Sequence, residues 1–254
     1  LLFLYMAIQQ LLLNMADDAL IIGHRNSEWT GLGPILEEDI AFSSMAQDKL
    51  GHALACYTIL HEHLGEPNPD TITFGRTAQD FRCSHLVAIP TTDYEIALVR
   101  HFLYDHAEIL RYQLLQQSTF RPLAQLATKI KGELKYHVLH ADTWIKQLGN
   151  ANDETAQMRL QTALNELWAY ALGIFEPSEH EALLQTEGVF VGEAKLQDSW
   201  YESIKHILTQ TNLQIPSIET TPIYGGRKAY PSEHLAPLLQ EMASVYQLDP
   251  TAEW

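Results

Sequence analysis

Two acid–histidine pairs, each separated by four residues, are the side chains in this sequence best suited to metal chemistry. Asp48 precedes His52 in one segment, and Glu133 precedes His137 in another. On a helix, residues four apart lie on the same face, so each pair could direct a carboxylate and an imidazole toward one point. These groups are common ligands of iron and manganese. Two acids from other segments could complete an inward-facing acidic quartet with Asp48 and Glu133: Asp17 and Asp105.

A cation beside the first pair argues against a metal. A carboxylate-bridged di-iron or di-manganese site in a helical bundle uses Glu-x-x-His motifs, but none of the twelve histidines has Asp or Glu three positions before it. Lys49 occupies that position relative to His52, and its ammonium would repel a divalent ion. We therefore favour a buried polar network, without metal and without a catalytic residue, formed by Asp17, Asp48, Lys49, His52, Asp105, Glu133 and His137. The alternative is a metal-binding oxidoreductase that uses both pairs.

Other chemistry has weaker support. His137 and His140 lie three residues apart and could bind zinc if a further ligand were present, but we favour histidines that simply line a helix. The segment Gly225-Gly-Arg-Lys228 could contact a phosphate or form a solvated turn. No phosphate-binding loop, dinucleotide fingerprint or nucleophile motif occurs in the sequence.

Helical periodicity indicates which elements position these residues. Four long helices are predicted over residues 9–26, 35–64, 92–118 and 122–149. Thr92 and Glu95 suggest a capping box for the third helix, and the connection before it is about twenty-five residues long. Two long helices, a crossover and two more helices favour an all-α, ferritin-like four-helix bundle, although a simple up-down bundle has the same pattern.

The remaining chain is predicted to add shorter helices to the same domain. We expect one ferritin-like domain over 6–254, with the bundle at about 9–148 and C-terminal helices at about 154–247. Only residues 188–192 resemble a strand. Translation is expected to start at Met6, so that residues 1–5 would be upstream sequence. The C-terminal helices are expected at about 154–173, 178–185, 194–211 and 232–247.

Composition narrows the functional class. The 254 residues include 16 Lys plus Arg and 32 Asp plus Glu, and the resulting charge of −16 disfavours nucleic-acid binding. No segment is expected to span a membrane. The only cysteines, Cys56 and Cys83, are not spaced as a metal or redox pair and fit reduced thiols in a cytoplasmic protein.

Several sequence blocks follow one another in a characteristic order along nearly the whole chain: Asp17, Arg25-x-x-Glu28-Trp29, Glu38-Asp39-Ile40, Asp48-x-x-Gly51, Phe74-x-Arg76, Phe81, Asp105, Glu133-Leu-Lys-Tyr136-His137, Leu148-Gly-Asn150, Leu167-Trp168, Phe175, Gly225-Gly-Arg-Lys228, Glu233-His-Leu235, Glu241-Met242 and Trp254. Together these blocks resemble the C-subunit family of bacterial 1,2-phenylacetyl-CoA epoxidases. The sequence departs from the family's pattern at Ala88-Ile89-Pro90, Ala229 and Pro231, and His52 stands where a glutamine is common.

The resemblance implies a structural subunit of an oxygenase complex that is not an enzyme on its own. It implies a homologous catalytic A subunit that holds a di-iron centre and the CoA thioester, a small B subunit, and a reductase that docks transiently. No cofactor is then expected in this chain. Arg25, Glu28 and Trp29 are our candidate partner interface, since Arg and Trp often anchor interfaces; alternatively, Trp29 closes the end of this chain's own bundle.

Overall fold

Four long helices form the centre of the molecule. A computed structural model describes residues 2–252, and Trp254, one of the matching residues, lies outside the described residues. Within 2–252 the structure contains helices, turns and loops and no β-strand, which confirms the all-α prediction. The four long helices are α1 (Leu2–Ser27), α2 (Leu36–Leu64), α5 (Tyr94–Leu115) and α6 (Arg121–Gly149).

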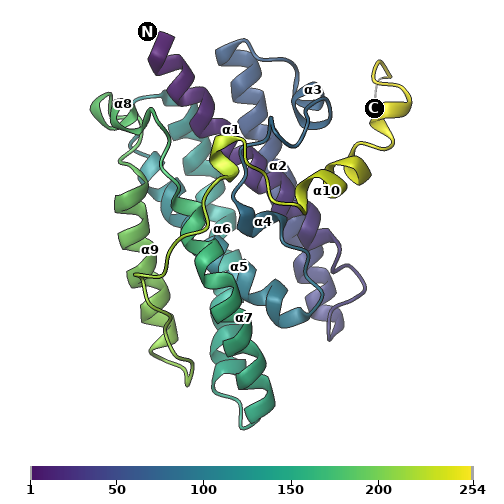
Figure 1. Cartoon of the computed structure of the whole chain (residues 1–254), viewed down its shortest axis with the longest axis vertical. Coiled ribbons are helices and arrows are strands. Elements are labelled where there is room, and N and C mark those ends of the chain that lie inside the picture. The colour runs from purple at the N-terminus through teal and green to yellow at the C-terminus, as the bar shows by residue number, and fades with distance from the viewer. Residues whose placement is uncertain (1, 253–254) are drawn as a thin grey trace.

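These helices pair as two hairpins, α1 with α2 and α5 with α6 (Figure 1). Gly65 ends α2 in the left-handed conformation at φ 69°, which glycine adopts without steric cost. The long connection that follows contains two short helices, α3 (Pro69–Phe74) and α4 (His85–Ala88). This crossover between two hairpins is the ferritin-like arrangement, and it distinguishes the fold from a simple up-down bundle.

The C-terminal elements cover one side of the bundle. α7 and α9 pack on α5, and α8 packs on α1, as does α4 of the crossover. α10 projects from the body (Figure 1), with Leu235, Leu238 and Leu239 buried against it. α1 and α5 are therefore enclosed, whereas α2 and α6 form the opposite layer. The C-terminal elements are α7 (Glu154–Leu172), η1 (Gly173–Phe175), α8 (Glu181–Thr186), α9 (Glu193–Leu208), η2 (Gly226–Lys228), α10 (Leu235–Met242) and η3 (Tyr246–Leu248).

Helix ends differ most from the sequence-based expectations. α1 begins at Leu2, so residues 2–5 continue the helix instead of preceding it, and Tyr5 donates a hydrogen bond to the Leu64 carbonyl. The expected capping box is wrong: Asp93 is the N-cap of α5, and Thr92 donates to Asp93 instead. The strand-like residues 188–192 form a loop, because after α8 there is no neighbouring strand for them to pair with in the described chain.

One large apolar cluster includes residues from the bundle and from the C-terminal helices. Trp168 of α7 and Trp200 of α9 lie at its centre, with ring centroids 5.1 Å apart. The Trp200 indole donates to the Leu103 carbonyl of α5 at 2.9 Å, so its buried polar atom is satisfied. None of the helices within residues 2–252 has the length and apolarity needed to cross a membrane.

Candidate functional site: a buried charged cluster

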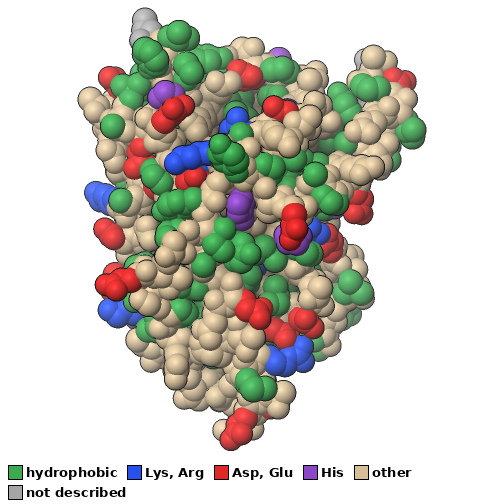
Figure 2. Space-filling model, in the orientation of Figure 1, with side chains coloured by type: hydrophobic (Ala, Val, Ile, Leu, Met, Phe, Trp, Pro, Cys, Tyr) green, Lys and Arg blue, Asp and Glu red, His purple; other side chains and the backbone are tan. Residues whose placement is uncertain are grey.

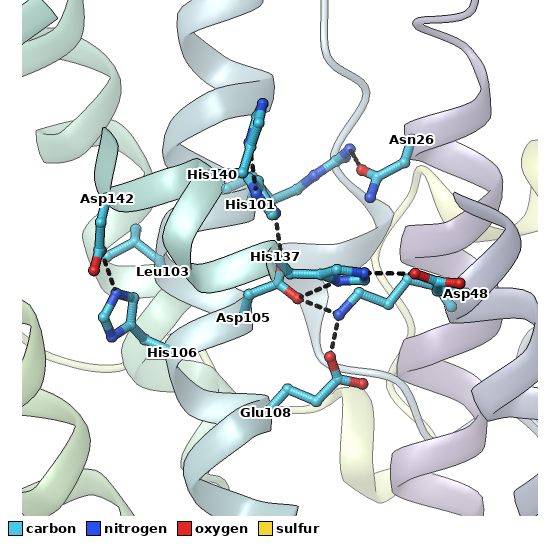
Figure 3. A network of polar contacts seen from close by, with 12 residues as sticks. Asn26, Asp48, His101, Leu103, Asp105, His106, Glu108, His137, His140 and Asp142 are labelled. Carbon is cyan, nitrogen blue, oxygen red and sulfur yellow. Dashed lines mark hydrogen bonds and ion pairs between the residues drawn. The ribbon is translucent and has the colours of Figure 1, made fainter. Parts of the chain in front are cut away.

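The centre of the bundle holds a lysine between two carboxylates. Lys49 of α2 donates from Nζ to Asp105 and to Glu108. These two acids, both labelled in Figure 3, lie one turn apart on α5. All three side chains are buried. Removing a charge from water costs several kcal/mol, so such a cluster is stable only when the charges offset one another at short range.

The pKa shifts of Lys49, Asp105 and Glu108 show that each of the three groups keeps its charge in the buried cluster. Burial opposes the charge of Lys49, but the adjacent carboxylates outweigh it and raise the pKa of its ammonium group. Burial likewise favours the neutral acids, yet Lys49 outweighs it and holds the pKa of Asp105 well below its usual range and lowers the pKa of Glu108. At neutral pH the three groups are therefore one cation and two anions.

Two histidines connect this cluster to the surface, and each one bonds across the interface between α2 and α6. His137 of α6 lies with Nδ1 3.3 Å from Asp105 and Nε2 3.0 Å from Asp48 of α2 (Figure 3). His52 of α2 lies 2.8 Å from Glu133 of α6. Burial would lower the pKa of His137, but its bonds to the two aspartates raise it. The two i, i+4 pairs therefore hydrogen-bond to each other across the two helices.

The hydrogen-bonded chain continues toward the beginning of α2. His101 contacts Asp105, and its second nitrogen lies 3.2 Å from His140 (Figure 3). His140 in turn contacts Glu38 at 3.0 Å. Tyr94 donates to Glu38 at 2.6 Å. Burial lowers the pKa of His101 to about 4, so this imidazole is neutral at pH 7.

Asp17 does not belong to this cluster, which corrects the expectation from the sequence. Its carboxylate accepts from Tyr57 at 2.6 Å and from Arg76 at 2.6 and 3.0 Å. The residue of α1 that faces Lys49 is Gly23, where a Cβ would lie 3.1 Å from the Lys49 Cβ. Asp17 lies six residues earlier, or about 9 Å along the helix axis, which is too far to share the cluster.

Four members of the cluster were not among the predicted site residues: Glu38, His101, Glu108 and His140. Glu108 could have been predicted from the sequence, because Asp105 and Glu108 are spaced i, i+3 and therefore share one face of α5. The sequence suggests His140 only as a zinc ligand beside His137. In the structure these two histidines contact different acids, and His106 and Asp142 form a separate pair at 2.8 Å (Figure 3).

The donor set does not fit a di-metal centre of the kind that ferritin-like bundles hold. The carboxylates of Asp105 and Glu108 are directed at the ammonium of Lys49, and Asp48 and Glu133 are hydrogen-bonded to histidines. Nδ1 of His52 has no hydrogen-bond partner within the described chain. Across residues 2–252, no three His, Cys, Asp or Glu side chains are arranged to hold a metal ion.

The candidate interface residues are occupied within this chain. Arg25 pairs with Glu28 at 2.6 Å and donates twice to the Ala88 carbonyl. The indole of Trp29 is 7% exposed, packs on Tyr94 with ring centroids 5.8 Å apart, and donates to Thr91 at 2.8 Å. These contacts favour the alternative that Trp29 closes the end of the bundle.

Arg227 is a buried structural residue, contrary to both expectations for its segment. It pairs with Asp18 of α1 through two bonds of 2.9 and 2.6 Å and also donates to the Asn14 and Arg82 carbonyls. The backbone amide groups of Gly225 and Arg227 donate to Glu176. The segment therefore attaches the C-terminal region to the bundle and does not form a solvated turn.

The fold and the site define a ferritin-like helical bundle in which a lysine lies between the central carboxylates. Comparison with known proteins is consistent with this class. The chain belongs to the family described as phenylacetic acid catabolic protein, whose family model matches residues 5–254. It is 29% identical over 242 residues to the C subunit of 1,2-phenylacetyl-CoA epoxidase from Escherichia coli K12, covering 95% of this chain and 97% of that protein.

A second relative indicates a common origin with a different component of that epoxidase. The chain is 27% identical over 154 residues to the A subunit of the same Escherichia coli enzyme. This match covers 59% of the chain and 48% of the relative.

Proposed function

We propose that this chain is the non-catalytic structural subunit of a multicomponent phenylacetyl-CoA ring epoxidase. It stabilises a homologous catalytic subunit, which holds the di-iron centre, and it binds no cofactor itself. The other partners are a small B subunit and a transiently bound reductase, all in the cytoplasm. The observation that carries this proposal is the position of Lys49, whose ammonium takes the two central carboxylates that a metal would otherwise require.

The similarity over nearly the full length of the Escherichia coli C subunit supports the assignment of the partner. The match covers 95% of this chain and 97% of that protein. The match to the A subunit covers a smaller part of the chain. A chain related to both proteins fits a complex of two homologous helical bundles, in which only the A subunit binds the metal and catalyses the reaction.

Metal content and reconstitution test the proposal together. The isolated chain, expressed with ample iron and manganese, should hold less than one tightly bound metal per chain. The catalytic subunit should co-purify with it and should epoxidise phenylacetyl-CoA, with reductase and NADPH, more durably in its presence. Two metals per chain, lost on replacing His52 and His137, would instead support the metal-binding oxidoreductase and overturn the structural role.

A further inference from the structure

The outer layer of the bundle has a surface that no part of residues 2–252 covers. The C-terminal helices enclose α1 and α5, but α2 and α6 lie side by side on the opposite side. Acidic, basic and hydrophobic side chains are interspersed on the covered side (Figure 2), as is usual for a solvated surface. The outer layer, formed by α2 and α6, has three distinctive features: an uncharged stripe on α2, several exposed apolar side chains, and an exposed glycine within each helix.

The outward stripe of α2 is uncharged over five turns. Ile40, Ser44, Gln47, Gly51, Leu54 and Thr58 follow the 3.6-residue period, and Asp48 at its edge is the only partly exposed charge between residues 40 and 58. Ile40 is 61% exposed and Leu54 is 55% exposed. On α6 the adjacent exposed residues include Tyr136 at 75% and Leu139 at 62%. An exposed apolar area of this kind is typical of an interaction site.

Two glycines lie within these helices at positions where neither a close contact nor a positive φ within residues 2–252 requires a glycine. Gly51 of α2 and Gly132 of α6 are both exposed, and within residues 2–252 a Cβ placed on either would have no heavy atom within 4 Å apart from the glycine, its two chain neighbours and the adjacent backbone of its own helix. Glycine in a helix interior is unfavourable compared with almost any other residue. Gly23 shows what such a glycine permits, because there α1 and α2 approach closely.

We propose that this outer face, defined by Ile40, Gly51, Leu54, Gly132, Tyr136 and Leu139, is the surface on which the homologous catalytic subunit docks. The occupant is a helical-bundle face with apolar side chains at its centre, and its helices cross close to the two glycines. This inference rests on the proposed function and names the contact surface for that partner. It replaces Arg25, Glu28 and Trp29 as the candidate interface.

Charge and size both fit such a partner. α6 carries five basic and two acidic residues in a chain with 16 basic and 32 acidic residues, and Lys129 and Lys135 are exposed on it. An acidic rim on the partner would complement them. The stripe of α2 is about 28 Å long, and two helices span about 20 Å, so each partner covers roughly 550 Å². The total of roughly 1,100 Å² is slightly above the minimum of about 1,000 Å² for a specific interface.

Arginine substitutions at the two glycines test this surface. Gly51→Arg and Gly132→Arg each insert a long side chain where the partner helix would approach, while the isolated chain should melt at the same or a higher temperature. Ser199→Arg, at an exposed position of α9, is the matched control. Each chain is co-expressed with the catalytic subunit and analysed by size-exclusion chromatography with light scattering.

We expect the glycine variants to bind the catalytic subunit at least a hundredfold more weakly, whereas the wild type and Ser199→Arg should form the complex. Full binding by both glycine variants would overturn the assignment of this face. If the variants instead convert a wild-type homodimer to monomers and still bind the catalytic subunit, the occupant is a second copy. Failure of the wild type itself to bind would refute the proposed function and not merely the position of the interface.

Discussion

Lys49 and Asp105 form an ion pair in which neither side chain has exposed surface. Asp105 also contacts His101 and His137, so the pair is the junction of the polar cluster in the bundle. A buried pair contributes little net stability compared with apolar residues of the same size, but removal of one partner leaves an uncompensated charge. This asymmetry makes the pair testable.

Lys49→Glu should lower the free energy of unfolding by about 3–5 kcal/mol, because three acids would then share one buried site. Urea denaturation at pH 7 measures the change. Lys135→Glu, at an exposed position of α6, is the control and should change stability by less than about 0.5 kcal/mol. The triple variant Lys49→Met, Asp105→Asn, Glu108→Gln removes all three charges and should recover most of the loss. Unchanged stability of Lys49→Glu would mean that Lys49 is not inside the bundle.

His101 should make stability depend on pH between about 6.5 and 4. Burial lowers its pKa to about 4 from an ordinary value of 6.5, so the unfolded chain takes up a proton first as the pH falls. The contribution of neutral His101 is therefore complete above pH 6.5 and is lost as the pH decreases toward 4, by at most about 3 kcal/mol. The unfolding free energy of the wild type minus that of His101→Asn should therefore become smaller as the pH is lowered from 6.5 to 4. A difference that does not vary with pH would contradict the assignment.

Arg227→Met should destabilise the protein by about 3–5 kcal/mol, because Asp18 would lose its buried partner and several carbonyls would lose their donor. Limited proteolysis should then cut the segment between α9 and α10 faster. Lys228→Met is the neighbouring control: its Nζ lies 3.7 Å from Glu176 and its side chain is half-exposed, so that variant should resemble wild type. Equal effects of the two substitutions would show that Arg227 is not the attachment point.

Trp29→Ala should destabilise the isolated chain by about 3–5 kcal/mol, as expected for a large aromatic side chain removed from a packed site. Thermal melting of the chain alone measures this effect. Leu32→Ala, at a nearby exposed side chain, should leave the melting temperature nearly unchanged. If Trp29→Ala instead melted like wild type but failed to bind the catalytic subunit, Trp29 would be an interface anchor.

The long helices could be predicted from local features of the sequence, and the absence of a Glu-x-x-His motif could be read from it directly. The 3.6-residue period, Gly65 and Pro122 mark the long helices, because helix formation and termination depend on residues a few positions apart. The sequence also shows a lysine in place of a metal-binding carboxylate, because Lys49 stands three residues before His52 on the same helix face. Asp93 instead of Thr92 became the N-cap because candidate caps one residue apart are nearly equivalent in sequence.

Only the tertiary structure decided which charges meet. Asp48 contacts His137 and His52 contacts Glu133 because α2 and α6 lie side by side in a particular axial register. The packing of α1 on α2 places Gly23 opposite Lys49, and the segment after α3 brings Arg76 to Asp17. Arg227 reaches Asp18 across 209 positions of the chain. A pattern within one helix defines which face is buried, but its position along the partner helix depends on how all the side chains pack together.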